Sequence, residues 1–159
     1  MKAASLSEIK KELTFLEPQV LQNLCLRLAK YKVENKELLT YLLFEASNES
    51  NYVENAKAEI DNLFMEFPSK TNLYLAKKTI RKILRFTNKQ VRYSGDLKTE
   101  LELRIFFCTK LKDSGIKINM SAVLKNLYKQ QIAKIGETLL KLPEDLQQDY
   151  QKEIEYLSY

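Results

Sequence analysis

The chain has 159 residues, a net charge of +5 from 26 basic and 21 acidic residues, three glycines, three prolines, two cysteines and no histidine. The missing histidine excludes Ser-His-Asp and Cys-His catalysis and histidine-based zinc sites. Three scattered glycines exclude a P-loop or a dinucleotide-binding turn, and so few glycines and prolines argue against a β-rich fold of this size.

Apolar residues recur with helical spacing along nearly the whole chain, which predicts a single all-α domain over residues 1–159. The first of eight expected amphipathic helices covers 5–16 and starts with Ser5 and Glu8 at capping-box spacing. The second opens at Pro18, since proline is favoured in a first turn. The third covers 35–47 and is apolar around most of its circumference, which predicts a central, buried helix.

The remaining predicted helices are separated by polar or turn-forming residues. Pro68 is expected to end the fourth helix, Asp96 to cap the sixth, and Gly115 to follow its end. Pro143 separates the last two helices. These five helices are expected over 51–67, 70–90, 97–113, 119–142 and 144–157.

The two cysteines, Cys25 and Cys108, stand among leucine, isoleucine and phenylalanine residues. They are predicted to be buried thiols in a reducing compartment, with no disulfide and no metal site. The N-terminus lacks a signal-peptide apolar stretch, and the longest apolar run, 38–44, is far shorter than the about 20 residues of a membrane-spanning helix. The sequence therefore predicts a cytoplasmic protein with no cofactor and no membrane partner.

Two segments, 37–44 and 100–107, share a pattern in which three residues separate a Glu-Leu pair from an apolar triplet. Over residues 18–142 the chain thereby resembles the stacked helical hairpins of armadillo- and HEAT-type proteins. This resemblance implies a right-handed stack that binds other macromolecules along one face. A compact helical bundle is the alternative fold, because the same apolar spacing suits both.

Residues 68–95 contain eight lysines and arginines, counting Lys70, and no acidic residue. The rest of the chain carries 18 basic and 21 acidic residues, so this segment supplies the whole positive net charge. On the expected helix, the apolar residues share one face and the basic residues form a stripe on the adjoining face, together with one tyrosine. The predicted anion-binding residues are Tyr74, Lys78, Arg81, Lys82, Arg85, Lys89 and Arg92.

Two explanations of this stripe stay open. Acidic residues of the helices expected over 51–67 or 144–157 could neutralise it within the fold, or it could bind an anionic ligand such as nucleic acid, a phosphorylated partner or an acidic protein surface.

Two carboxylate pairs, Glu8 with Glu12 and Glu100 with Glu102, stand beside lysines and are expected on solvated helix faces.

The first functional prediction is a non-enzymatic helical interaction or scaffold protein with a protein partner, because no catalytic set is recognisable. The alternative is nucleic-acid binding through the basic helix 70–92, with contacts mainly to phosphate. An enzyme that assembles Glu, Lys, Tyr or Arg from separate helices is the third possibility. A pocket that holds a Lys–Glu pair with shifted pKa values would favour it.

Overall fold

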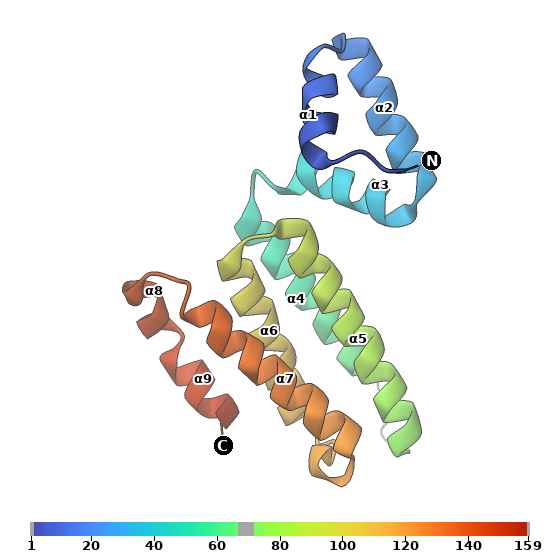
Figure 1. Cartoon of the computed structure of the whole chain (residues 1–159). Coiled ribbons are helices and arrows are strands. Elements are labelled where there is room, and N and C mark those ends of the chain that lie inside the picture. Colours follow the sequence, from blue (N-terminus) through green and yellow to red (C-terminus); the bar gives the residue numbers. More distant parts are fainter. Residues whose placement is uncertain (1, 67–71, 159) are drawn as a thin grey trace. The chain divides into compact units, whose positions relative to one another are not determined.

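The computed structural model describes residues 2–66 and 72–158 (Figure 1). Over these residues the chain is all-α, as predicted, without a strand. Pro68 and Lys70, and with them the expected junction of the fourth and fifth helices, lie outside the described residues. The helices and helical turns are α1 (Leu6–Thr14), α2 (Pro18–Tyr31), α3 (Val33–Thr40), the π-helical turn η1 (Tyr41–Glu45), α4 (Glu49–Met65), α5 (Leu73–Ser94), α6 (Leu97–Asp113), the 3₁₀ turn η2 (Ile118–Met120), α7 (Ala122–Leu139), α8 (Glu144–Asp149) and α9 (Gln151–Ser158).

The chain separates into two compact units, an N-terminal unit of residues Met1–Phe44 and a C-terminal unit of residues Glu45–Tyr159. The prediction of one domain over 1–159 did not include this division. The N-terminal unit holds α1, α2, α3 and most of η1, and the C-terminal unit holds all the later helices.

A capping box defines the start of α1 in the N-terminal unit. The Ser5 hydroxyl accepts a hydrogen bond from the backbone N–H of Glu8 at 3.3 Å, and the Glu8 carboxylate accepts one from the Ser5 N–H at 2.7 Å. This pair is the predicted capping box, which satisfies two N–H groups that no helical carbonyl reaches. α2 begins at Pro18, as predicted, and α3 packs against α2.

The N-terminal unit buries very little. Among its described residues only Tyr41 is buried, and neither α2 nor α3 contains a buried residue. The prediction of a central, buried helix over 35–47 is therefore wrong, because α2 is the main packing neighbour of α3 and cannot cover its whole circumference. Cys25 on α2 is exposed, so the prediction of a buried thiol is wrong there as well.

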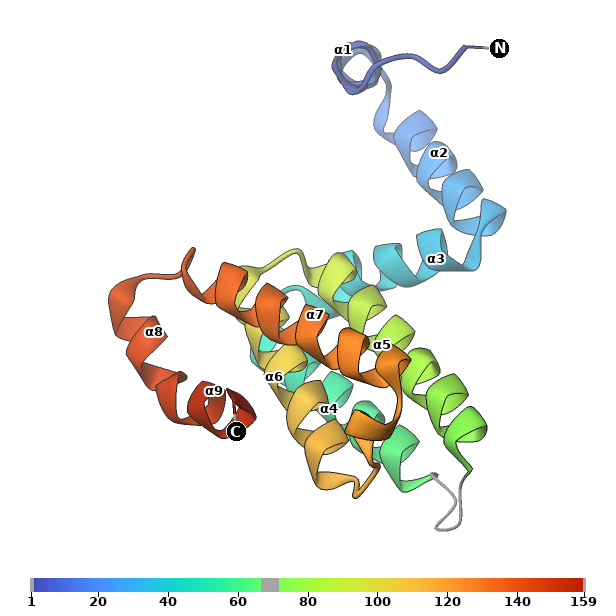
Figure 2. The ribbon, with the colours of Figure 1, turned by 60° about the horizontal axis from the view of Figure 1, so that its bottom comes forward.

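The C-terminal unit is organised around α6, which contacts α4, α5, α7 and α9. Figures 1 and 2 show α4, α5, α6 and α7 gathered with their axes roughly aligned, and α8 and α9 along one side. A helix with four neighbours is typical of a bundle, the alternative that the sequence left open. The resemblance to armadillo- and HEAT-type stacks over 18–142 stays a prediction.

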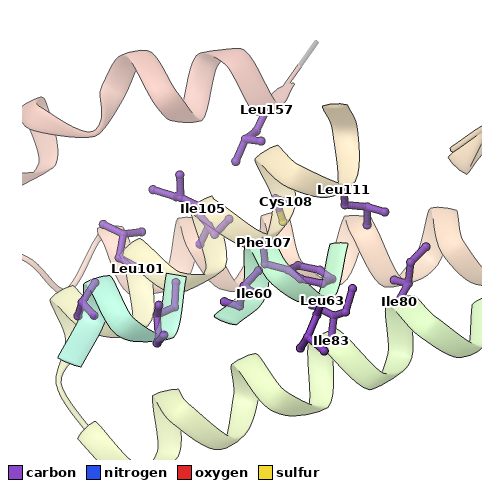
Figure 3. Close-up of a cluster of buried hydrophobic side chains, with 14 of the residues drawn as sticks. Ile60, Leu63, Ile80, Ile83, Leu101, Ile105, Phe107, Cys108, Leu111 and Leu157 are labelled. Carbon is purple, nitrogen blue, oxygen red and sulfur yellow. The ribbon is translucent and has the colours of Figure 1, made fainter. Parts of the chain in front are cut away.

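The apolar core lies where these helices meet α6 (Figure 3). The Phe107 side chain is fully buried, and its ring centroid is 6.0 Å from that of Phe64 on α4. Cys108 is buried, as predicted. The last predicted helix is in fact two short helices, α8 and α9, and Leu157 on α9 belongs to the same core. Further core residues are Ile60, Leu63, Ile80, Ile83, Leu101, Ile105 and Leu111.

Candidate functional site

Helix α5 presents one apolar face and one cationic face. It is capped at its start by Asn72, whose side chain accepts a hydrogen bond from the N–H of Leu75 at 2.9 Å. It ends at Gly95, whose φ of 68° lies in the left-handed region that favours glycine. Of the residues predicted to point inward, Ala76, Ile80, Ile83 and Thr87 are buried and Leu84 is half-buried, whereas Leu73 in the first turn is exposed. On the face turned away from the core, the exposed basic residues are Lys78, Arg81, Lys82, Arg85 and Arg92.

Part of this cationic face forms an open groove of about 620 Å³. Four of the seven predicted residues line it: Tyr74, Lys78, Arg81 and Arg85. The other three, Lys82, Lys89 and Arg92, lie on the same helix but do not line the groove. Sequence reasoning missed the remaining lining residues, Lys77, Leu84, Asn88 and Val123.

Helical spacing could have found one of these missed residues, whereas another depends on the fold. Asn88 stands three residues after Arg85 and seven after Arg81, so it shares their helix face. Val123 lies on α7 and reaches the groove only because α7 folds back beside α5. No local signal in the sequence indicates that contact.

A buried polar network fixes the base of the groove. The Arg104 guanidinium, on α6 and only 5% exposed, donates to the Asn88 side-chain oxygen at 2.9 Å and to the Gln131 side-chain oxygen at 2.7 Å. Its Nε also donates to the Glu100 carboxylate at 2.8 Å. One guanidinium thus connects α5, α6 and α7, and it holds Asn88, a groove-lining residue, in place.

Two of the acidic residues that could have neutralised the stripe, Glu54 and Asp61, have other partners. Asp61 on α4 pairs with Lys110 on α6, and Glu54 pairs with Lys57 on its own helix at 3.0 Å. Lys89 makes a contact of its own. Among the described residues, no ion pair involves Lys78, Arg81, Lys82 or Arg85. The cations of the groove therefore lie unpaired in contact with solvent.

A second pocket of about 380 Å³ contains a Lys–Glu–Tyr cluster. The Lys57 ammonium lies 2.8 Å from one Glu102 carboxylate oxygen, and the Tyr150 hydroxyl donates to the other at 3.0 Å. Glu102 and Glu100 are half-buried and paired with Lys57 and Arg104, so the prediction that this carboxylate pair lies on a solvated face is wrong. The sequence did not reveal the cluster, because its members are up to about ninety residues apart.

The pKa shifts of Lys57 and Tyr150 keep these two groups in their ordinary protonation states at neutral pH. Partial burial lowers the pKa of Lys57, but its hydrogen bonds with Glu102 and Glu54 outweigh burial and raise the pKa above its usual value. Burial, followed by the hydrogen bond to Glu102, raises the pKa of Tyr150. General acid–base catalysis near neutral pH needs shifts in the opposite direction, so this cluster has the character of a structural ion pair.

Among the residues that the structure describes, no three His, Cys, Asp or Glu side chains gather as a metal site would require. Nor does any helix in the described ranges combine the length and apolar character needed to cross a bilayer. Comparison of the chain with protein-family models, with curated proteins and with solved structures gives no significant match.

Proposed function

We propose that this chain is a non-enzymatic helical interaction protein that binds the phosphate backbone of nucleic acid along α5. The observation that supports the proposal most directly is the groove lined by Lys77, Lys78, Arg81 and Arg85, with no acidic residue in its lining. Like charges one helical turn apart destabilise a helix. An anionic ligand would relieve that repulsion, since no acidic residue of the described chain pairs with Lys78, Arg81, Lys82 or Arg85.

The length of the stripe suits a polymer better than a small anion. From Tyr74 to Arg92 the helix rises about 27 Å, because each residue adds about 1.5 Å. Binding of several phosphates along this length would release the counterions condensed on the nucleic acid, and affinity would then depend steeply on salt. Contacts of this kind carry little sequence information.

Single-stranded nucleic acid is the favoured form. Tyr74 is 72% exposed and lines the groove beside the basic residues. An exposed aromatic ring next to guanidinium groups provides a stacking surface for unpaired bases, whereas the bases of a duplex are already stacked on one another. Asn88 adds a polar group at the same surface.

The test is a fluorescence-anisotropy titration of labelled single-stranded and duplex oligonucleotides at 50 and 200 mM salt. If about six phosphates are neutralised, affinity should fall on the order of 10³-fold between these two concentrations. The double variant Arg81→Glu/Arg85→Glu should abolish binding. The matched control Lys10→Glu/Lys11→Glu makes the same change of charge on α1 and should retain it.

A further variant separates the two forms of nucleic acid. Tyr74→Ala should weaken single-stranded binding by about tenfold or more, as expected for the loss of one stacked base, and leave duplex binding unchanged. The proposal is wrong if wild type does not bind either oligonucleotide at 50 mM salt, or if the control on α1 loses binding as strongly as the groove variant. Binding of an acidic protein alone would assign the stripe to a protein partner.

A further inference from the structure

The N-terminal unit contains an open groove of about 520 Å³ formed by α2, α3 and η1. Its lining is mainly apolar with a basic rim, and it includes no acidic residue. Apolar lining residues come from both helices and from the π-helical turn. They are Leu26, Ala29, Val33, Leu39, Leu43 and Phe44, and the rim is formed by Lys30, Lys32 and Lys36.

The backbone explains why these apolar side chains remain uncovered. A single residue, Lys32, separates α2 from α3, so the two helices meet at an angle and leave a hollow between them. The helix then widens into η1, where Leu43 and Phe44 are 64% and 72% exposed. π-helical turns of this kind occur frequently at functional sites.

We propose that the groove between α2 and α3 binds an acidic amphipathic helix of a partner protein. Charge complementarity indicates the chemistry of that helix. Lys30, Lys32 and Lys36 are exposed, and none of them forms an ion pair with another described residue. An apolar floor with a cationic rim matches a helix that places leucines on one face and carboxylates along its flanks.

A second copy of this chain fits the groove less well. The acid-rich helices α8 and α9 already pack Leu146, Ile154 and Leu157 against the core of the C-terminal unit. α1 does expose Leu6, Ile9 and Leu13, but its two acidic residues are balanced by two basic ones. Within the described residues, neither end of the chain thus combines a free apolar face with acidic flanks.

The test uses three designed acidic peptides of about 18 residues, with leucines at helical spacing and glutamates on the flanks. Each has a counterpart in which lysine replaces glutamate and another in which the leucine positions are scrambled. Fluorescein-labelled acidic peptides should bind the full-length wild type at least about tenfold more tightly than either counterpart. The variant Lys32→Glu/Lys36→Glu should reverse this preference in favour of the lysine peptides, a result that loss of folding cannot produce.

Two further variants make the result specific to this groove. Phe44→Ala should weaken binding of the acidic peptides about tenfold, as expected for the loss of an aromatic contact at the centre of an interface. Arg81→Glu/Arg85→Glu should bind them as wild type does, because the inference is independent of nucleic-acid binding along α5. Equal affinity for acidic and lysine peptides would overturn the proposal. So would sedimentation of wild type as a dimer that Phe44→Ala converts to a monomer.

Discussion

The segments 37–44 and 100–107 share one sequence pattern and have opposite environments. In the second segment Leu101, Ile105 and Phe107 are buried in the core, whereas their counterparts Leu38, Leu42 and Phe44 are exposed. The difference lies in their neighbours, because α6 contacts four helices while α3 packs mainly against α2. An apolar helix is buried only when enough other helices surround it, and the pattern of one segment does not contain that information.

The largest effect is expected when the same change is made in both segments. Phe107→Ala should lower the free energy of unfolding by about 3–5 kcal/mol, because it leaves a cavity in the core. Phe44→Ala should change it by less than about 0.5 kcal/mol, as is usual for surface substitutions. Urea denaturation followed by circular dichroism measures both. Similar losses of unfolding free energy in the two variants would show that Phe44 is packed in solution. The two segments would then not differ in their environments.

The buried Arg104 and the exposed Arg85 provide the same comparison of environments for a charged residue. Arg104→Ala should destabilise the C-terminal unit by about 3 kcal/mol, because it leaves the buried Gln131 side chain and the Glu100 carboxylate without their partner. Arg85→Ala, on the exposed face of α5, should leave stability within about 0.5 kcal/mol of wild type and weaken nucleic-acid binding. Chemical denaturation and anisotropy on the same preparations compare the two effects. A stability loss in Arg85→Ala would place that guanidinium in an intramolecular pair.

The buried Cys108 and the exposed Cys25 should differ in their effect on how stability depends on pH. Burial raises the pKa of the Cys108 thiol from 9.0 to about 12. At neutral pH, well below 9, the thiol is neutral in both states. As the pH rises from 9 towards 12, the unfolded chain loses this proton while the folded chain keeps it, so stability falls. By pH 10 the loss should reach about 1.4 kcal/mol relative to neutral pH.

Matched variants isolate this contribution. Cys108→Ala should remove the part of the alkaline decline that the buried thiol causes, although its stability at neutral pH will also be lower. Cys25→Ala should keep the decline of wild type, because Cys25 is exposed. Denaturation curves between pH 7 and 10.5 test both, and an unchanged decline in Cys108→Ala would show that other groups account for it.

Features set by short-range interactions could be predicted from the sequence. The sixth expected helix, 97–113, matches α6 at both ends, because Asp96 caps its start and the Ser114-Gly115 stop lies just past its end. The two faces of α5 could be assigned for the same reason, since helical spacing places residues on faces without reference to the rest of the fold.

Features set by long-range contacts could not be predicted. The groove on α5 is completed by Val123, which is thirty-eight residues beyond Arg85 in sequence. The pairing of Asp61 with Lys110, which leaves the stripe without that acidic neighbour, depends on the position of α6 beside α4. Leu42 and Phe44 are exposed because, within the described part of the N-terminal unit, α3 packs mainly against α2.

The smallest expected effect compares one interaction, the helix N-cap, in the two units. Asp96 caps α6 by accepting a hydrogen bond from the N–H of Thr99 at 2.9 Å, and Asp96→Ala should lower the free energy of unfolding by about 1 kcal/mol. Ser5→Ala removes the corresponding cap of α1 and should shorten that helix, as measured by NMR chemical shifts. It should leave the unfolding of the C-terminal unit unchanged, because α1 has no buried residue through which to stabilise a core. If Ser5→Ala shifted the global transition as strongly as Asp96→Ala, the two units would have to unfold together. The exposed apolar residues of the N-terminal unit would then stabilise the fold, and they would not be free to bind a partner.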